Sequence, residues 1–166
     1  MKHLLTLWML ALCLCVSAKE TCPKVIPALQ EWKGGSGKLV LPAEGSIVVA
    51  PADEAALKSV ATGKPGKNDI YLSLMKPDKQ LGKEGYVLTA GRYAGIEAPA
   101  RQGVFWGTRS LLQILYNEKG QLPKGVARDW PQYPSRGFML DVGRKFFTMD
   151  FLRQYVKILS FYKLNE

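Results

Sequence analysis

The segment from Arg136 to Lys163 constrains the fold of this chain most strongly, because it has the pattern of a strand, a loop and a helix in succession. Its first part, Phe138 to Val142, is an apolar run that is too short for a helix and follows a segment containing proline and glycine, which predicts a strand. After a short loop, Thr148 is a predicted helix N-cap. Asp150 then places a carboxylate in the first turn, where the helix dipole favours it.

The helix predicted after Thr148 has a single apolar stripe. Its apolar residues recur at spacings of three and four: Phe151, Leu152, Tyr155, Val156, Leu159 and Tyr162. Lys157 and Lys163 place cations toward the other end of the helix. Because Leu164 to Glu166 begins a further element, we interpret the segment as one βα unit whose continuation is missing.

Several motifs in this segment occur together. Arg136 to Arg144 has the pattern Arg-Gly-x-Met-Leu-Asp-x-x-Arg, and an aromatic pair and a helix ending in Tyr-Lys-Leu-Asn follow it. Over about thirty residues, from Pro134 to Asn165, the segment resembles the start of the catalytic barrel of family 20 glycoside hydrolases, the β-N-acetylhexosaminidases. Many members have His where this chain has Lys145. The resemblance implies that residues 135–166 are the first βα unit of an incomplete (β/α)8 TIM barrel.

Residues 22–132 mix predicted strands and helices, which indicates an α+β domain with one sheet and helices on one side of it. The predicted strands are 39–41, 46–50, 69–75 and 85–90, with 93–98 closing a hairpin, and the predicted helices are 53–62 and 101–116. The glycine-rich segment from Trp32 to Lys38 is expected to be a turn, because a strand follows it and not the helix that a phosphate cradle needs.

The predicted helix 101–116 contains two glycines, Gly103 and Gly107, which cost helix stability of the order of 1 kcal/mol each relative to Ala. Close packing against the sheet would explain them. Its expected buried face consists of Val104, Leu111, Leu112 and Leu115, broadened by Phe105 and Trp106. The order of Gly85-Tyr-Val-Leu88, Gly103 to Gly107 and Leu111-Leu112-Gln113 resembles the small N-terminal domain of family 20 enzymes. Residues 129–134, with two prolines and two aromatics, are a predicted stiff connection to the barrel.

Residues 1–18 have the pattern of a cleaved signal peptide. Lys2 precedes an apolar run that is too short to span a bilayer comfortably, and Val16-Ser17-Ala18 is a small-residue cleavage site. We therefore expect export, to a periplasm or the exterior, without a membrane span. Cleavage leaves Cys22 as the single cysteine, and the single His lies in the signal segment, so the sequence predicts no internal disulfide, no metal site and no cofactor.

The formal net charge is +9, and loss of Lys2 with the signal segment leaves +8. Such a charge can indicate a nucleic-acid partner. Here the basic residues are scattered without a run of five or six, and export is expected, so we interpret them as solvated surface and exclude nucleic acid. The resemblance implies instead a glycan partner that contains N-acetylhexosamine.

In a (β/α)8 barrel, functional groups lie where strands end at the C-terminal face. This geometry places Arg144 at the active-site face and Arg136 at the opposite face. A guanidinium is a permanently charged fork of donors that suits two adjacent sugar hydroxyls, and the resemblance implies that role for Arg144. Asp141 is mid-strand and is expected to be structural, paired with an Arg inside the barrel, for which Arg136 is the candidate.

The resemblance implies hydrolysis of terminal non-reducing N-acetylhexosamine by a substrate-assisted retaining mechanism, in which an Asp orients the acetamido group and an adjacent Glu is the general acid. That pair belongs to a later strand and is not matched here. The adjacent Asp53 and Glu54 open a predicted helix of the small domain and are not its equivalent. We therefore predict no catalytic residue in this chain, and an inactive 166-residue protein.

Two alternatives remain open on the sequence alone. One is a non-catalytic exported module that binds glycan or a partner chain, in which the apolar stripe would be docked on its own domain. In a barrel start, that stripe would be exposed. The other is an exported hydrolase of a different family that shares the accessory domain, against which the match from Arg136 to Arg144 argues.

Overall fold

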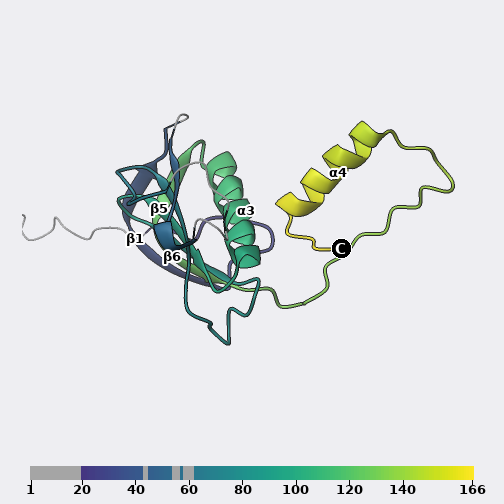
Figure 1. Cartoon of the computed structure of the whole chain (residues 1–166). Coiled ribbons are helices and arrows are strands. Elements are labelled where there is room, and N and C mark those ends of the chain that lie inside the picture. The colour runs from purple at the N-terminus through teal and green to yellow at the C-terminus, as the bar shows by residue number, and fades with distance from the viewer. Residues whose placement is uncertain (1–19, 43–44, 54–56, 58–61) are drawn as a thin grey trace, which may run out of the picture.

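The computed structural model describes residues 20–42, 45–53, 57 and 62–166. Its main body is a mixed sheet of six strands with the order β1-β6-β4-β5-β3-β2, and helix α3 covers one face (Figure 1). The elements in chain order are β1 (Glu31–Val40), β2 (Ile47–Val49), the 3-10 helix η1 (Pro51–Asp53), β3 (Ile70–Leu74), β4 (Tyr86–Ala90), β5 (Ala94–Ala98), α3 (Arg101–Asn117), β6 (Gln121–Asp129) and α4 (Met149–Phe161).

Both kinds of strand pairing occur in the sheet. The pairs β1–β6, β6–β4 and β4–β5 are antiparallel, whereas β3 pairs parallel with β5 and with β2. The α+β class and the β4–β5 hairpin are thus confirmed. The predicted signal segment 1–18 lies outside the described residues, and so does most of the predicted helix 53–62.

Two sequence interpretations of the first half of the sheet are corrected. The glycine-rich segment 32–38 is not a turn but lies inside β1, where the pairing with β6 shifts register between Gly34 and Lys38. Strand β6 was not predicted at all, because Pro123 and Gly125 are residues that normally argue against a central strand. Pro123 is tolerated next to this irregularity, where it lies opposite Lys38.

Helix α3 packs very closely on the sheet, and its two glycines make this possible. A Cβ at Gly107 would lie 2.5 Å from the Ile96 side chain and 3.1 Å from the Tyr86 ring, and a Cβ at Gly103 would collide with the Gly85 carbonyl. The expected explanation of these glycines is confirmed. Val104 and Trp106 are buried as predicted, but Phe105 and Leu112 are not, since the helix turns Ser110 and Ile114 toward the sheet instead.

The C-terminal segment is only partly as predicted. Helix α4 forms, and the Thr148 hydroxyl caps it by accepting a hydrogen bond from the Phe151 amide at 3.2 Å. The predicted strand from Phe138 to Val142 does not form, because no described strand pairs with its backbone. Met139 is consequently 90% exposed.

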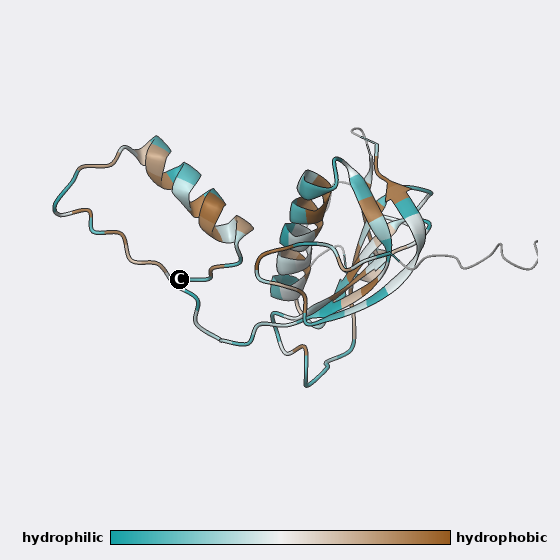
Figure 2. Cartoon of the chain, turned by 180° about the vertical axis from the view of Figure 1, so that it is seen from behind, coloured by the Kyte–Doolittle hydropathy of each residue, from teal (hydrophilic) through white to brown (hydrophobic). Residues whose placement is uncertain are grey.

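Helix α4 buries none of its residues, and Phe151 and Val156 of its apolar stripe are 42% and 63% exposed. Figure 2 shows apolar and polar residues along this helix, apart from the sheet. It lies beside α3 at a distance from the sheet, connected by the long segment 130–148 (Figure 1). Among the described residues, no helix has the length and apolarity needed to span a membrane.

The substitution G107A tests the packing of α3 on the sheet. In an open helix, replacing Gly by Ala stabilises. Here we expect the free energy of unfolding in urea to fall by about 1–3 kcal/mol, because the added methyl group overpacks the interface with Ile96 and Tyr86. The control is G91A, where an added Cβ meets no atom within 4 Å. Equal stability of G107A and wild type would contradict the packing account.

Candidate functional site

Arg144 lies in the loop before α4, and its side chain is 92% exposed. Its Nε is 3.3 Å from the Asp141 carboxylate. The other Asp141 oxygen accepts hydrogen bonds from the amides of Gly143, at 2.9 Å, and Arg144, at 3.4 Å. Asp141 therefore shapes the loop and holds the arginine next to it, while most of the guanidinium faces solvent.

Arg136 does not pair with Asp141, so this part of the sequence interpretation is wrong. Its Nη2 lies 2.9 Å from the Glu84 carboxylate, and its Nε donates to the Lys163 carbonyl at 2.8 Å. The guanidinium also lies over the Trp106 ring, at 5.7 Å from the centroid. The reason for the difference is geometric. Without the strand that was expected from 138 to 142, the chain between Arg136 and Asp141 is not held against a sheet, and Glu84 of the first domain is the nearer anion.

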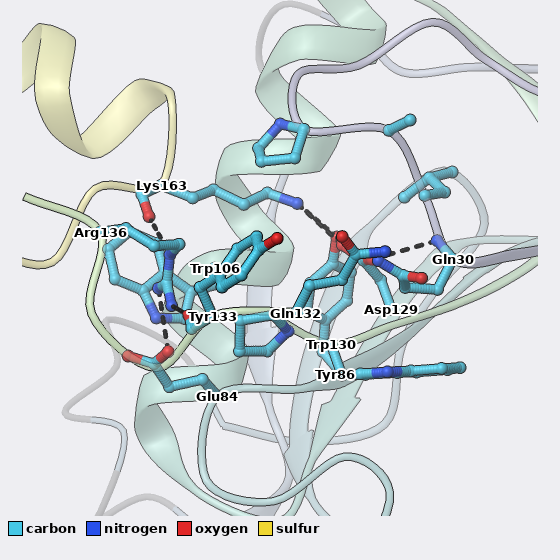
Figure 3. A pocket seen from close by; sticks show the side chains of 14 residues that line it. Gln30, Glu84, Tyr86, Trp106, Asp129, Trp130, Gln132, Tyr133, Arg136 and Lys163 are labelled. Carbon is cyan, nitrogen blue, oxygen red and sulfur yellow. Dashed lines mark hydrogen bonds and ion pairs between the residues drawn. The ribbon is translucent and has the colours of Figure 1, made fainter.

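Four polar side chains, Tyr86, Ser110, Asp129 and Lys163, meet in the interior and are named here the junction cluster. Lys163 Nζ lies 2.9 Å from the Asp129 carboxylate, and it donates to the Tyr86 hydroxyl at 2.9 Å. The Tyr86 hydroxyl donates to the same carboxylate oxygen at 2.6 Å and lies 2.5 Å from the Ser110 hydroxyl. Figure 3 shows Lys163 reaching across to Asp129 from the far side of the pocket.

The backbone at Lys163 shows why a lysine reaches this place. The residue follows the C-terminal end of α4 with a φ of 61°, a left-handed conformation that usually selects Gly or Asn. Its amide donates to the Ser160 carbonyl at 3.0 Å, and the Leu164 amide donates to the Leu159 carbonyl at 3.0 Å, which closes the helix end. The lysine thus occupies a strained backbone position, and its side chain is almost completely buried.

Burial dominates the electrostatics of the junction cluster. It lowers the pKa of the Lys163 ammonium, an effect that the Asp129 carboxylate opposes. Burial also raises the pKa of the Tyr86 hydroxyl well above its ordinary value, and the negative charge of Asp129 adds to this. The arrangement therefore keeps the tyrosine protonated, as a donor to the carboxylate.

A cavity of about 490 Å³ opens beside the junction cluster. Its walls are the residues that precede β1, from Pro27 to Gln30, and those that follow β6, from Trp130 to Tyr133. Arg136 and Glu84 form its other side (Figure 3). Arg144 is not among the lining residues, so the cavity and the predicted sugar-binding residue are separate features.

The remaining candidate residues have structural surroundings. Asp53 accepts a hydrogen bond from the Leu74 amide at 2.7 Å, which ties η1 to β3. Cys22 is a free, exposed thiol. Within the described part of the chain, no group of three or more His, Cys, Asp or Glu side chains is arranged to hold a metal ion.

Sequence reasoning missed the junction cluster. It interpreted Lys163 only as a cation near a helix end and Asp129 only as the start of a linker. The bonded members lie 24 to 77 residues apart along the chain, so no local spacing connects them. One weak indication was present in the sequence: Lys163 stands just after a predicted helix end, where glycine is usual.

In a comparison with known protein families, two family models match successive parts of the chain. The family model described as glycosyl hydrolase family 20, domain 2, matches residues 22–130, and the model of the family's catalytic domain matches residues 133–166. The first model alone covers most of the chain.

Individual β-hexosaminidases and related enzymes are also similar to this chain. The chain is 30% identical over 163 residues to a β-hexosaminidase of Porphyromonas gingivalis, and the aligned region covers 92% of this chain and 19% of that protein. It is 29% identical over 162 residues to a lacto-N-biosidase of Bifidobacterium bifidum, 87% of the chain and 14% of that protein. The solved β-N-acetylhexosaminidase of Streptomyces coelicolor A3(2) superposes with a TM-score of 0.73 at 25% identity, over 90% of this chain and 35% of that one.

The pKa shift of Tyr86 predicts a pH dependence. Above about pH 10 the unfolded chain loses the tyrosine proton while the folded chain retains it, so the stability present below pH 10 is lost as the pH rises. The expected loss from this group approaches about 1.4 kcal/mol per pH unit. Urea unfolding of wild type and Y86F between pH 8 and 11 measures it. We expect the wild-type curve to fall more steeply than that of Y86F, and parallel curves would contradict the assignment.

Proposed function

The chain belongs to glycosyl hydrolase family 20, and on this premise we propose that it is the N-terminal part of an exported β-N-acetylhexosaminidase. In this proposal, residues 22–130 form the accessory domain and residues 133–166 begin the catalytic barrel. The observation that carries the proposal is that both family models match, in the order in which the family has these domains. The chain spans only 14% and 19% of the two curated relatives described above.

The backbone near the C-terminal residues supports the barrel interpretation. The Asn165 amide donates to the Arg136 carbonyl at 2.9 Å, and the Phe138 amide donates to the Glu166 carbonyl at 3.2 Å. The residue numbers of the two segments increase together, from Arg136 to Phe138 and from Asn165 to Glu166, as they do in a pair of parallel strands. Residues 136–138, α4 and residues 165–166 therefore have the connectivity of a βαβ unit, in which a helix joins neighbouring parallel strands.

The proposed reaction is the removal of terminal non-reducing N-acetylhexosamine from glycans. In the substrate-assisted scheme, the acetamido group of the sugar attacks its own anomeric carbon, and an Asp–Glu pair on a later strand orients this group and protonates the leaving oxygen. We place Arg144 on the sugar hydroxyls that lie far from the scissile bond. Its exposure and its carboxylate neighbour Asp141 are compatible with a guanidinium held ready for two hydroxyl acceptors.

The alternative of a free-standing binding module is disfavoured by one observation. Such a module would cover its own apolar stripe, yet Val156 is 63% exposed and α4 buries no residue. Export rests on the signal-like residues 1–18, and it would bring the enzyme to glycans outside the cytoplasm.

The role of Arg144 is tested in the longer protein. We expect R144A to lower kcat/KM for an aryl N-acetyl-β-glucosaminide by about 10- to 100-fold, because charge-assisted hydrogen bonds to the sugar are lost. The matched control is R153A, which removes another exposed arginine that is paired with an aspartate three residues away. Equal kinetics of the two variants would exclude Arg144 from substrate binding.

The 166-residue chain itself should be catalytically inactive, because the Asp–Glu pair of the family is not matched in it. Release of the aryl group from the same substrate by the purified chain is the measurement. We expect a rate no higher than that without protein. Measurable turnover that survives repeated purification would show that the 166-residue chain contains a catalytic acid, and would overturn the proposed division of roles.

A further inference from the structure

Buried polar side chains connect the N-terminal domain to the C-terminal end of α4. We propose that residues 22–130 act as an anchor that fixes the C-terminal end of α4, and thereby the point at which the chain leaves the helix for the next element. The anchoring contacts lie within this chain and do not depend on the proposed enzymatic activity.

The first contact is the ion pair between Lys163 and Asp129. Both side chains are only 8% exposed, and Asp129 ends β6 while Lys163 follows α4. A buried charge is costly unless it is paired and hydrogen-bonded. Because Tyr86 also bonds to both partners, the two charges are satisfied only while the Lys163 side chain reaches the end of β6.

The second contact is independent of the first. Gln113 of α3 is 2% exposed, and its Nε2 donates to the Phe161 carbonyl at 2.6 Å. The same amide also bonds to both backbone groups of Ile26, at 2.7 and 2.8 Å. One buried side chain thus joins the residues before β1, helix α3 and the last turn of α4.

The third contact fixes the chain on the other side of the helix. Arg136 pairs with Glu84 of the N-terminal domain and donates to the Lys163 carbonyl. The two segments that would become neighbouring barrel strands, around Arg136 and around Asn165, are therefore held side by side by the first domain. The rest of α4 extends away from this place and is exposed (Figure 1).

These contacts explain the strained backbone of Lys163. Glycine would end α4 without strain, but it would leave Asp129 buried and unpaired. The lysine closes the helix and also supplies the cation that the first domain requires. If the proposed function is right, the N-terminal domain supports the start of the catalytic domain. Separating the two parts would break the buried ion pair and its hydrogen bonds.

Amide hydrogen exchange of the dilute 166-residue chain tests the anchor. We expect K163M to accelerate the exchange of amides 158–166 at least tenfold, whereas amides of β4 and β5 change less than threefold. The matched control is K157M, the same substitution at an exposed position of the same helix. It should leave both groups of amides within threefold of wild type.

Three further variants keep the test decisive. D129N should accelerate the same amides, and the double variant K163M/D129N should do so by less than the product of the two single effects, because it leaves no unpaired charge. Q113L removes the second contact without touching the junction cluster, and it should accelerate amides 161–164 at least tenfold.

Either of two results would overturn the anchor. If K163M and Q113L both exchange like K157M, these contacts do not hold the end of α4. If K163M accelerates β4 and β5 as much as 158–166, the ion pair supports the sheet as a whole and not the helix end.

Discussion

The ion pair between Lys163 and Asp129 is the interaction on which the arrangement of this chain depends. It joins the end of the last strand of the sheet to the residue that closes α4, at a N–O distance of 2.9 Å and away from solvent. Removing two charges from water is unfavourable unless further hydrogen bonds complete their coordination. Tyr86 provides them, and it can do so because β4 lies next to β6 and because the glycines of α3 let Ser110 approach its hydroxyl.

Sequence reasoning succeeded where the signal was local. The period of apolar residues located α3 and α4, the Thr148 cap fixed where α4 begins, and the glycines of α3 indicated its close packing. It failed where long-range pairing decides the outcome. Strand β6 contains Pro123 and Gly125, which only its partners β1 and β4 make tolerable, and the glycines of β1 resemble a turn until that pairing is known.

In the candidate site, too, local motifs could be used for prediction and long-range contacts could not. Arg144 could be selected from its motif and from the general geometry of barrels, and its role stays a prediction. The companion chosen for Asp141 was wrong, because that choice assumed a strand from 138 to 142 that the described chain does not form. The junction cluster could not be found from the sequence, since its members come from β4, α3, β6 and the end of α4 and meet only in the folded chain.

Together, these features describe a folded N-terminal domain against which the C-terminal segment is held, and in our proposal that segment begins a catalytic domain. The sheet and α3 have a closed core, whereas Met139 and the stripe of α4 present apolar side chains to solvent. The structure thus combines a domain that has its own core with a C-terminal segment that exposes apolar side chains, and buried polar contacts connect them.

The most direct test of this account is to read the coding DNA beyond the codon for Glu166. A (β/α)8 barrel takes about 250 residues. The account predicts an open reading frame that continues for some 200 codons or more and encodes adjacent Asp and Glu residues at a predicted strand end. A stop codon immediately after Glu166 would contradict it, because the chain would then have no barrel to begin and no catalytic acid.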